Sequence, residues 1–169
     1  TIAWYLSGFS IDWLYWAFLA SLASATADTW ETEIGSFSKS LPLNILTWKR
    51  VPKGFSGGIS LLGTSGGVIG AAIIVFIAAF MGFVDWDLTL IGLMIGAGFL
   101  GSVVDSILGA SIQAKFKCEV CGKATERVSH CHEETKHISG LLWLDNDWVN
   151  VAGSLSGGLI FIAVYILLH

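Results

Sequence analysis

Four long apolar segments alternate with polar stretches along the chain. They cover residues 2–27, 57–83, 88–113 and 148–168, and each reaches the roughly 20 residues that a helix needs to cross a bilayer. The first is the least uniform, because Asp12 interrupts it. The pattern predicts an all-α fold, a polytopic transmembrane helix bundle with about four spans.

Composition supports a membrane protein. Hydrophobic residues make up 54% of the chain and charged residues only 13%, whereas soluble domains carry about 25% charged residues. The 169 residues suffice for one integral membrane domain, 1–169. Because the chain does not begin with Met, we expect a processed chain or the C-terminal part of a longer protein. The net charge of −4 gives no indication of a nucleic-acid partner.

The basic residues predict the topology. All of them lie in two loops, 34–56 and 114–147, and they are Lys39, Lys49, Arg50 and Lys53 in the first loop and Lys115, Lys117, Lys123, Arg127 and Lys136 in the second. Four spans would put these loops on the same side, and the positive-inside rule makes that side cytoplasmic. We therefore expect two cytoplasmic loops that carry the site, with both termini outside.

Acidic residues stand at the end of the first segment and inside the third. Asp28 and Glu31 would share one face of a continuing helix, with Glu33 pointing elsewhere. Neighbouring carboxylates repel unless a cation lies between them, and their hard oxygen atoms suit Mg²⁺. Asp105 within a span costs several kcal/mol unless it is paired or hydrated, so a functional role is the default. The alternatives are a solvated helix end for the pair and a structural hydrogen bond for Asp105.

Basic residues and glycines follow. Lys49, Arg50 and Lys53 precede Gly57 and Gly58. Next comes Gly63-Thr64-Ser65-Gly66-Gly67 at the start of the second span. Backbone N–H groups of such a segment can approach phosphate oxygens while the cations neutralise them. The alternative is that the cations bind anionic lipid and that the glycines pack helices.

Polar residues also begin the fourth span. Asn146 and Asn150 would share a helix face, and Asp145 precedes them. An Asn buried in a membrane is costly unless it binds something, so we predict a role in orienting phosphate, ribose or metal-bound water. A helix N-cap is the alternative, although it leaves Asn150 unexplained.

The second loop, 114–147, contains a candidate zinc knuckle. Cys118 and Cys121 form a Cys-x-x-Cys pair, and the sequence His130-Cys131-His132 follows. Three thiolates and one imidazole would make a closed, structural zinc site, with His130 as the first choice and His132 or His137 as alternatives. A redox-active cysteine pair is the competing interpretation.

Several motifs, in order, resemble one integral membrane family. They are Asp28-Thr-Trp-Glu31-x-Glu33-Ile-Gly35, Thr47-Trp-x-x-Val-Pro52-x-Gly54-x-x-Gly57-Gly58, Gly101-Ser102-x-x-Asp105-Ser-x-Leu-Gly109-Ala, His137-Ile-x-Gly140 and Leu144-Asp145-Asn146-x-x-Val-Asn150. The family is DUF92, which includes the transmembrane protein 19 group and the plant phytyl-phosphate kinases. Its members usually carry more spans before the first motif, and some of them lack the cysteines.

The resemblance implies a reaction. A membrane-embedded kinase would transfer the γ-phosphoryl group of CTP, or of another nucleoside triphosphate, to an isoprenoid monophosphate such as phytyl or geranylgeranyl phosphate. Asp28, Glu31 and Asp105 would hold Mg²⁺, and Lys49, Arg50 and Lys53 would balance the phosphate charge. The alternatives are a cytidylyltransferase that forms a CDP-lipid and a cation or substrate transporter. The implied partners are the lipid substrate and either further copies of the chain or missing N-terminal helices.

Overall fold

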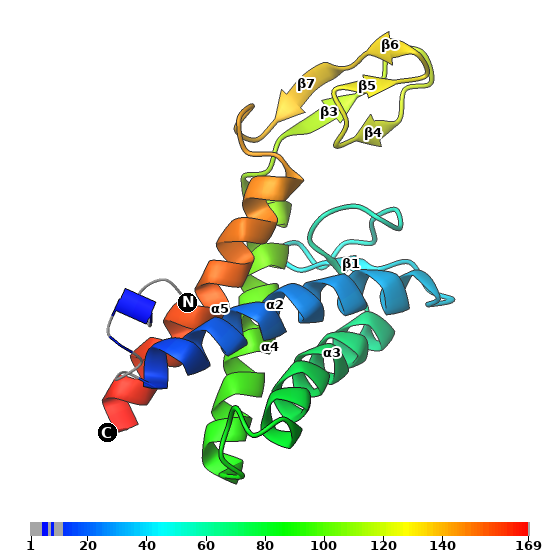
Figure 1. The fold of residues 1–169 in the computed structure, drawn as a ribbon. Coiled ribbons are helices and arrows are strands. Elements are labelled where there is room, and N and C mark those ends of the chain that lie inside the picture. Colours follow the sequence, from blue (N-terminus) through cyan, green and yellow to red (C-terminus); the bar gives the residue numbers. More distant parts are fainter. Residues whose placement is uncertain (1–4, 7, 9–11, 169) are drawn as a thin grey trace.

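A computed structural model describes residues 5–6, 8 and 12–168, and four long helices make up most of this part of the chain (Figure 1). They are α2 (Asp12–Ser36), α3 (Leu61–Phe80), α4 (Leu88–Ser111) and α5 (Asn146–Leu168). Helices α2 and α3 lie side by side, α4 and α5 form a second pair, and α2 crosses the second pair. The mostly helical architecture predicted from the sequence is confirmed.

Three of the described helices are long and apolar enough to cross a membrane. Helices α3, α4 and α5 have mean hydropathies of 2.2, 1.8 and 2.2 in their most apolar windows, and they match the last three predicted segments. Helix α2 does not belong to this group, because its Trp, Tyr, Ser, Thr and acidic residues make it less apolar.

The first predicted segment, 2–27, ends too early. Helix α2 begins at Asp12 and continues to Ser36, nine residues beyond the predicted end. Residues 2–4, 7 and 9–11 lie outside the described part of the chain. The acidic residues that were predicted to close the segment therefore lie well inside a helix, where Asp28 and Glu31 share a face.

The strictly all-α prediction is wrong for the two loops, because both contain short strands. In the first loop, β1 (Leu43–Asn44) pairs with β2 (Gly58–Ile59). In the second loop, β3 (Lys115–Lys117), β4 (Ala124–Thr125) and β7 (Lys136–Ser139) form an antiparallel sheet in the order β4-β3-β7, and β5 (Ser129–His130) pairs with β6 (Glu133–Glu134). We call this second unit the β3–β7 module.

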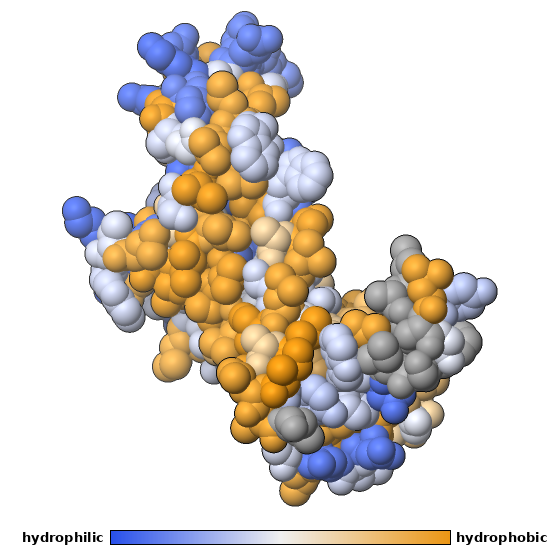
Figure 2. Space-filling model, turned by 90° about the vertical axis from the view of Figure 1, so that its left-hand side faces the viewer, coloured by the Kyte–Doolittle hydropathy of each residue, from blue (hydrophilic) through white to orange (hydrophobic). Residues whose placement is uncertain are grey.

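The surface divides into an apolar helical part and a polar end. Figure 2 shows apolar side chains over the helices and hydrophilic ones gathered over the β3–β7 module. Large apolar residues such as Leu61, Phe80 and Leu167 are mostly exposed. An apolar surface this extensive needs a lipid environment, as expected for an integral membrane protein.

Small residues let the helices approach closely. Ala20, Ala23 and Ala27 form a fully buried stripe on α2. On α4, a Cβ atom at Gly101 would lie 2.8 Å from Gly153 O and 2.8 Å from Gly157 N, both on the backbone of α5. Backbone-to-backbone packing of this kind is typical of membrane helices, where it replaces a hydrophobic driving force between them.

We predict that Gly101→Ala destabilises the protein, whereas Gly96→Ala on the same helix does not. The added methyl at position 101 meets rigid backbone and should cost about 1–3 kcal/mol, whereas at Gly96 no described atom lies within 4 Å. Thermal unfolding in detergent should show a decrease of several degrees for the first variant only. Equal stabilities would contradict the tight α4–α5 packing.

Candidate functional site

Eight of the fourteen residues predicted for the magnesium and phosphate site line one cavity. It has a volume of about 390 Å³ and lies where α2, α4 and the start of α5 meet the first loop. The predicted residues in its lining are Asp28, Glu31, Lys53, Gly57, Gly58, Asp105, Asn146 and Asn150. They come from four separate stretches of the chain, so the fold assembles them.

Three carboxylates from two helices face this cavity. Asp28 and Asp105, on α2 and α4, are close enough to interact directly, and Glu31 is close enough to repel both. Glu31 is buried, and its Oε1 lies 3.3 Å from the Thr64 hydroxyl of α3. Within the described residues, its Oε2 has no hydrogen-bond partner. A buried carboxylate oxygen without a partner is costly, so the fold bears a penalty to keep Glu31 beside the two aspartates.

Helix α5 completes the acidic cluster with amides. With its amide nitrogen facing Asp105, Asn150 donates to Oδ2 of that residue at 3.2 Å and accepts from Asn146 Nδ2 at 3.1 Å. Gly153 lies one turn deeper, and a Cβ there would come within 2.7 Å of Asp105 Cβ. The absence of a side chain at this position therefore allows α5 to approach Asp105.

A second, smaller cavity continues from the first. Its volume is about 100 Å³, and Asp28, Thr29, Asp105 and Asn150 line both cavities. The other lining residues are Ser24, Ala25, Gly153 and Ser154, all of which lie deeper along α2 and α5. The carboxylates thus stand between a larger outer cavity and a smaller inner one.

The first loop reaches α4 through a glycine. Gly57 has a φ of +76°, and a Cβ there would lie 2.5 Å from Ala110 Cβ and 2.7 Å from Ser106 O. Both the left-handed backbone and the close approach require Gly at this position. The loop is thereby held against the end of α4 and forms one wall of the cavity.

Three basic residues, Lys49, Arg50 and Lys53, were predicted to reach the site. Of these three, only Lys53 is among the described residues that line the cavity. Its ammonium donates to the carbonyl oxygens of Ser36, at 3.0 Å, and Ser38, at the C-terminal end of α2. A cation there also complements the negative end of the helix dipole. Lys49 and Arg50 are exposed in the first loop and outside the described lining, so the structure does not bring them to the acidic cluster.

The segment from Thr64 to Gly66, predicted as a phosphate cradle, lies at the start of α3 and packs against α2. It lies in the first turns of α3, where the Thr64 amide donates to Ser60 O at 2.8 Å. Ser65 is exposed, and a Cβ at Gly66 would meet Trp30 O of α2 at 2.9 Å. These contacts favour the alternative of small residues that pack α3 on α2, and the phosphate cradle stays a prediction.

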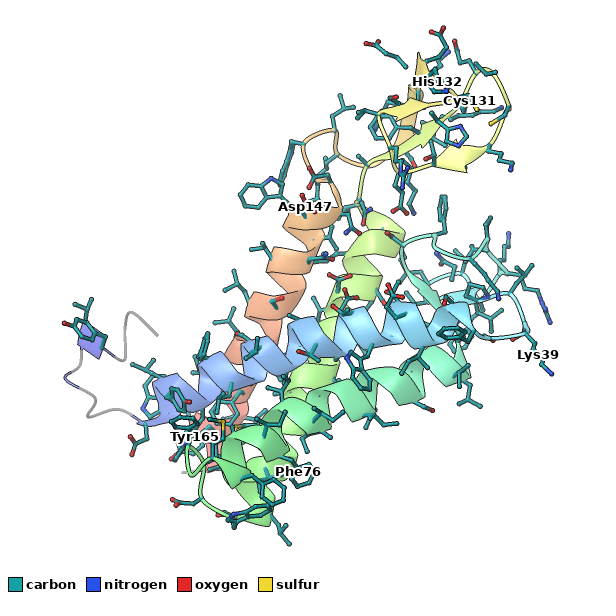
Figure 3. All side chains as sticks on the ribbon, turned by 45° about the vertical axis from the view of Figure 1, so that its right-hand side comes forward. Lys39, Phe76, Cys131, His132, Asp147 and Tyr165 are labelled. Carbon is teal, nitrogen blue, oxygen red and sulfur yellow. The ribbon has the colours of Figure 1, made fainter. Side chains whose placement is uncertain are left out.

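Asp145 caps α5. Its Oδ1 accepts hydrogen bonds from the backbone amides of Asp147 and Trp148, both at 3.1 Å. Figure 3 shows Asp147 at the start of α5, and Lys39 far from it on the loop after α2. The described lining of the cavity does not include Asp145, whose placement matches the N-cap alternative.

Sequence reasoning missed Glu126 altogether. This residue of the β3–β7 module lines the cavity, and its carboxylate accepts from Ser56 N at 2.8 Å, Ser56 Oγ at 2.7 Å and Gln113 Nε2 at 3.0 Å. An isolated Glu among many polar residues forms no motif that sequence reasoning could recognise. Its role depends on the contact between two loops that are distant in the sequence. The contact also shows that the two basic loops lie at the same end of the molecule.

The predicted zinc ligands come together in the β3–β7 module. The ligand atoms of Cys118, Cys121, His130 and Cys131 all lie within 4.8 Å of one another. The Cys121 backbone amide, hydrogen-bonded to Cys118, lowers the pKa of that thiol to about 6. The other two candidate histidines do not belong to this group of four. His132 is exposed, and the ring of His137 packs on Phe116. The structure thus favours His130, the first choice, and zinc itself stays a prediction.

Comparisons with known proteins agree with a membrane family. Residues 2–158 match the family described as "Integral membrane protein DUF92". One similar protein is "Uncharacterized membrane protein MJ0933" of Methanocaldococcus jannaschii, with 29% identity over 95% of this chain and 55% of that protein. Two others are from Arabidopsis thaliana: "Protein PGR", with 34% identity over 79% of this chain and 48% of that protein, and "Protein VTE6, chloroplastic", with 26% identity over 86% of this chain and 36% of that protein. The chain spans about half the length of the curated relatives it matches, or less. No solved structure matches.

The donor set of the acidic cluster fits a hard divalent cation. Mg²⁺ is commonly bound by one or two protein carboxylates together with water and substrate phosphates, and not by a complete protein cage. Asp28 and Asp105 supply such a pair, and Glu31 lines the same cavity. The arrangement can therefore hold a cation that carries a phosphorylated ligand.

We predict that Mg²⁺ raises the unfolding temperature of the wild-type protein but much less that of Asp105→Asn. At ten times its Kd, a ligand of the folded state contributes about 1.4 kcal/mol, which corresponds to a few degrees. Asp85→Asn, in the turn between α3 and α4 at the other end of the helices, is the matched control and should respond like wild type. A full response in Asp105→Asn would remove that carboxylate from the cation site.

Proposed function

Because the chain belongs to the DUF92 family of integral membrane proteins, we propose that it transfers the γ-phosphoryl group of a nucleotide to an isoprenoid monophosphate. CTP is the proposed donor, and the product is the isoprenoid diphosphate. The resemblance of its motifs to the phytyl-phosphate kinases motivates this assignment. The reaction is proposed for the whole protein, and the chain spans about half the length of the two relatives named first.

One observation carries the proposal. Asp28 and Asp105 lie close together on a polar cavity, with Lys53 and Asn150 on the same cavity. Phosphoryl transfer needs positioning and charge neutralisation more than covalent chemistry, and these groups provide both. The position also suits a reaction between a water-soluble donor and a lipid acceptor, because the two can meet only at the membrane surface.

Each residue has a defined task in this proposal. Asp28 and Asp105 hold Mg²⁺, which neutralises charge on the nucleotide phosphates when it is bound. Glu31 lies near both aspartates and adds negative charge to the cation site. Lys53 offers its ammonium to a phosphate oxygen while it remains anchored to the end of α2. Asn150 keeps the Asp105 carboxylate oriented.

The inner cavity suits the acceptor. Its additional lining residues lie deeper along the helices, on the side from which a membrane lipid would approach. An oxygen of the lipid phosphate attacks the γ-phosphorus, the bond to the β–γ bridging oxygen breaks, and CDP leaves. The acceptor phosphate is already anionic, so no general base is required. The prenyl chain extends along the apolar faces of the helices.

We also propose that the active face is cytoplasmic. The two basic loops that contact each other through Glu126 and Ser56 would then face the cytosolic nucleotide pool, in line with the positive-inside rule. Further helices or further copies of the chain would complete the bundle around the lipid.

The reaction is tested with purified protein, phytyl or geranylgeranyl phosphate, and CTP labelled at either the α- or the γ-phosphorus. We expect the γ-label in a lipid diphosphate and the α-label in CDP. Asp28→Asn should lower the rate by about 100- to 1,000-fold, as removal of one preorganised electrostatic contact does elsewhere. Transfer of the α-label to lipid would show a cytidylyltransferase instead, and no transfer of either label would leave the kinase proposal without support.

A second prediction distinguishes the cations. Lys53→Ala should lower kcat about 10-fold or more, whereas Lys49→Ala should retain wild-type kinetics, because only Lys53 lines the described cavity. Lys53→Arg, which keeps the charge, should recover part of the activity. Unfolding temperatures of the variants show whether loss of the α2 contact also affects stability. Equal effects at the two positions would contradict the assignment of Lys53.

A further inference from the structure

Two turns of the β3–β7 module bring four metal-ligating side chains together. Cys118 and Cys121 flank the turn between β3 and β4, where the Gly122 amide donates to Cys118 O at 2.9 Å. His130 and Cys131 come from the turn between β5 and β6, and Figure 3 shows Cys131 at the tip of the module. His130 Nδ1 lies 3.5 Å from Cys121 Sγ and 3.2 Å from Cys131 Sγ. These separations are close to those between ligands around a single tetrahedral ion.

The module has little else to hold it together. Of residues 115–139, all of which are described, only Phe116 and Cys118 are buried. Its strands are two to four residues long, and isolated hairpins of that size are at best marginally stable in water. Cys131 also adopts a left-handed backbone with φ of 56°, which is unfavourable for a residue with a side chain. Small units with so small a core usually depend on a metal or disulfides.

The ligand set indicates which metal. Three thiolates and one imidazole, with no carboxylate among them, favour Zn²⁺ over hard cations such as Mg²⁺. Four protein ligands leave no open coordination position, so the ion would be structural. One disulfide would use two of the three thiols and would leave the His130 imidazole without a role.

The same module reaches the acidic cavity. Glu126 lies in the chain between the two ligand-bearing turns, and its carboxylate binds the amide and hydroxyl of Ser56 and the amide of Gln113. Ser56 directly precedes Gly57, the residue that packs the first loop against α4. An ordered module therefore holds the loop that forms one wall of the cavity.

We propose that Cys118, Cys121, His130 and Cys131 bind one structural zinc ion, and that this ion orders the β3–β7 module so that Glu126 fixes the Ser56–Gly57 wall of the cavity. The metal site stands on its own ligands and does not depend on the proposed phosphoryl transfer. The link to the cavity is a positioning role, because Glu126 acts through Ser56.

Metal content is the first test. Untagged protein purified without chelator should contain close to one zinc per chain by mass spectrometry, and His130→Ala should lose most of it. His132→Ala, two residues away and outside the group, is the matched control and should keep its zinc. Replacement by Co²⁺ should give the visible bands of a tetrahedral ion and near-ultraviolet thiolate charge-transfer bands. Absence of zinc, recovery of the cysteines as a disulfide, or equal zinc content in the two histidine variants would overturn the proposal.

Hydrogen exchange tests the link to the cavity. Removal of zinc by a chelator should speed exchange of the amides in residues 115–139 and in residues 54–58. Glu126→Gln should retain zinc and the Co²⁺ spectrum but show faster exchange at Ser56, because the neutral amide binds a backbone N–H less strongly. Unchanged exchange at residues 54–58 in both experiments would overturn the positioning role, whatever the catalytic activity of the protein.

Discussion

Two carboxylates on different helices, Asp28 on α2 and Asp105 on α4, lie close together in a molecule whose helices α3, α4 and α5 are largely apolar. Burying like charges together is unfavourable, so the neighbouring structure must compensate for it. Asn150 supplies a donor to Asp105, and Gly153 makes room for the approach of α5. Much of the packing around α2 can be understood as a consequence of holding this pair in place. A fold that bears such a cost indicates a function for the pair.

The arrangement separates tasks between the helices and the loops. The helices provide the apolar surface that lies in lipid and the rigid positions of the acidic groups. The loops provide Lys53, Gly57 and Glu126, which form the wall that faces water. Loops normally vary and move more than the elements that they connect, so a site built partly from loops needs additional contacts. Here those contacts are the Lys53 bonds to the end of α2 and the Glu126 bonds to Ser56.

Sequence reasoning predicted what depends on short-range patterns. Hydropathy located α3, α4 and α5, the three-residue spacing put Asp28 and Glu31 on one face, and ligand spacing selected His130. It left the choice open where a residue type has two uses: the glycines around Gly66 could cradle phosphate or pack helices, and the position of α2 favours packing. It failed at Glu126, whose role depends on contact between segments 70 residues apart in the chain.

The proposed function requires that Asp28 and Asp105 hold a cation together with the phosphates of a nucleotide. Electron–nuclear double resonance tests this with Mn²⁺ in place of Mg²⁺, on protein that contains ¹³C-carboxylate aspartate, in the presence of CTP. The account predicts ¹³C couplings from aspartate and ³¹P couplings from the nucleotide on the same Mn²⁺ ion, with the ¹³C coupling reduced in Asp28→Asn and in Asp105→Asn. A bound ion that shows ³¹P but no ¹³C coupling, or couplings that neither substitution changes, would contradict it.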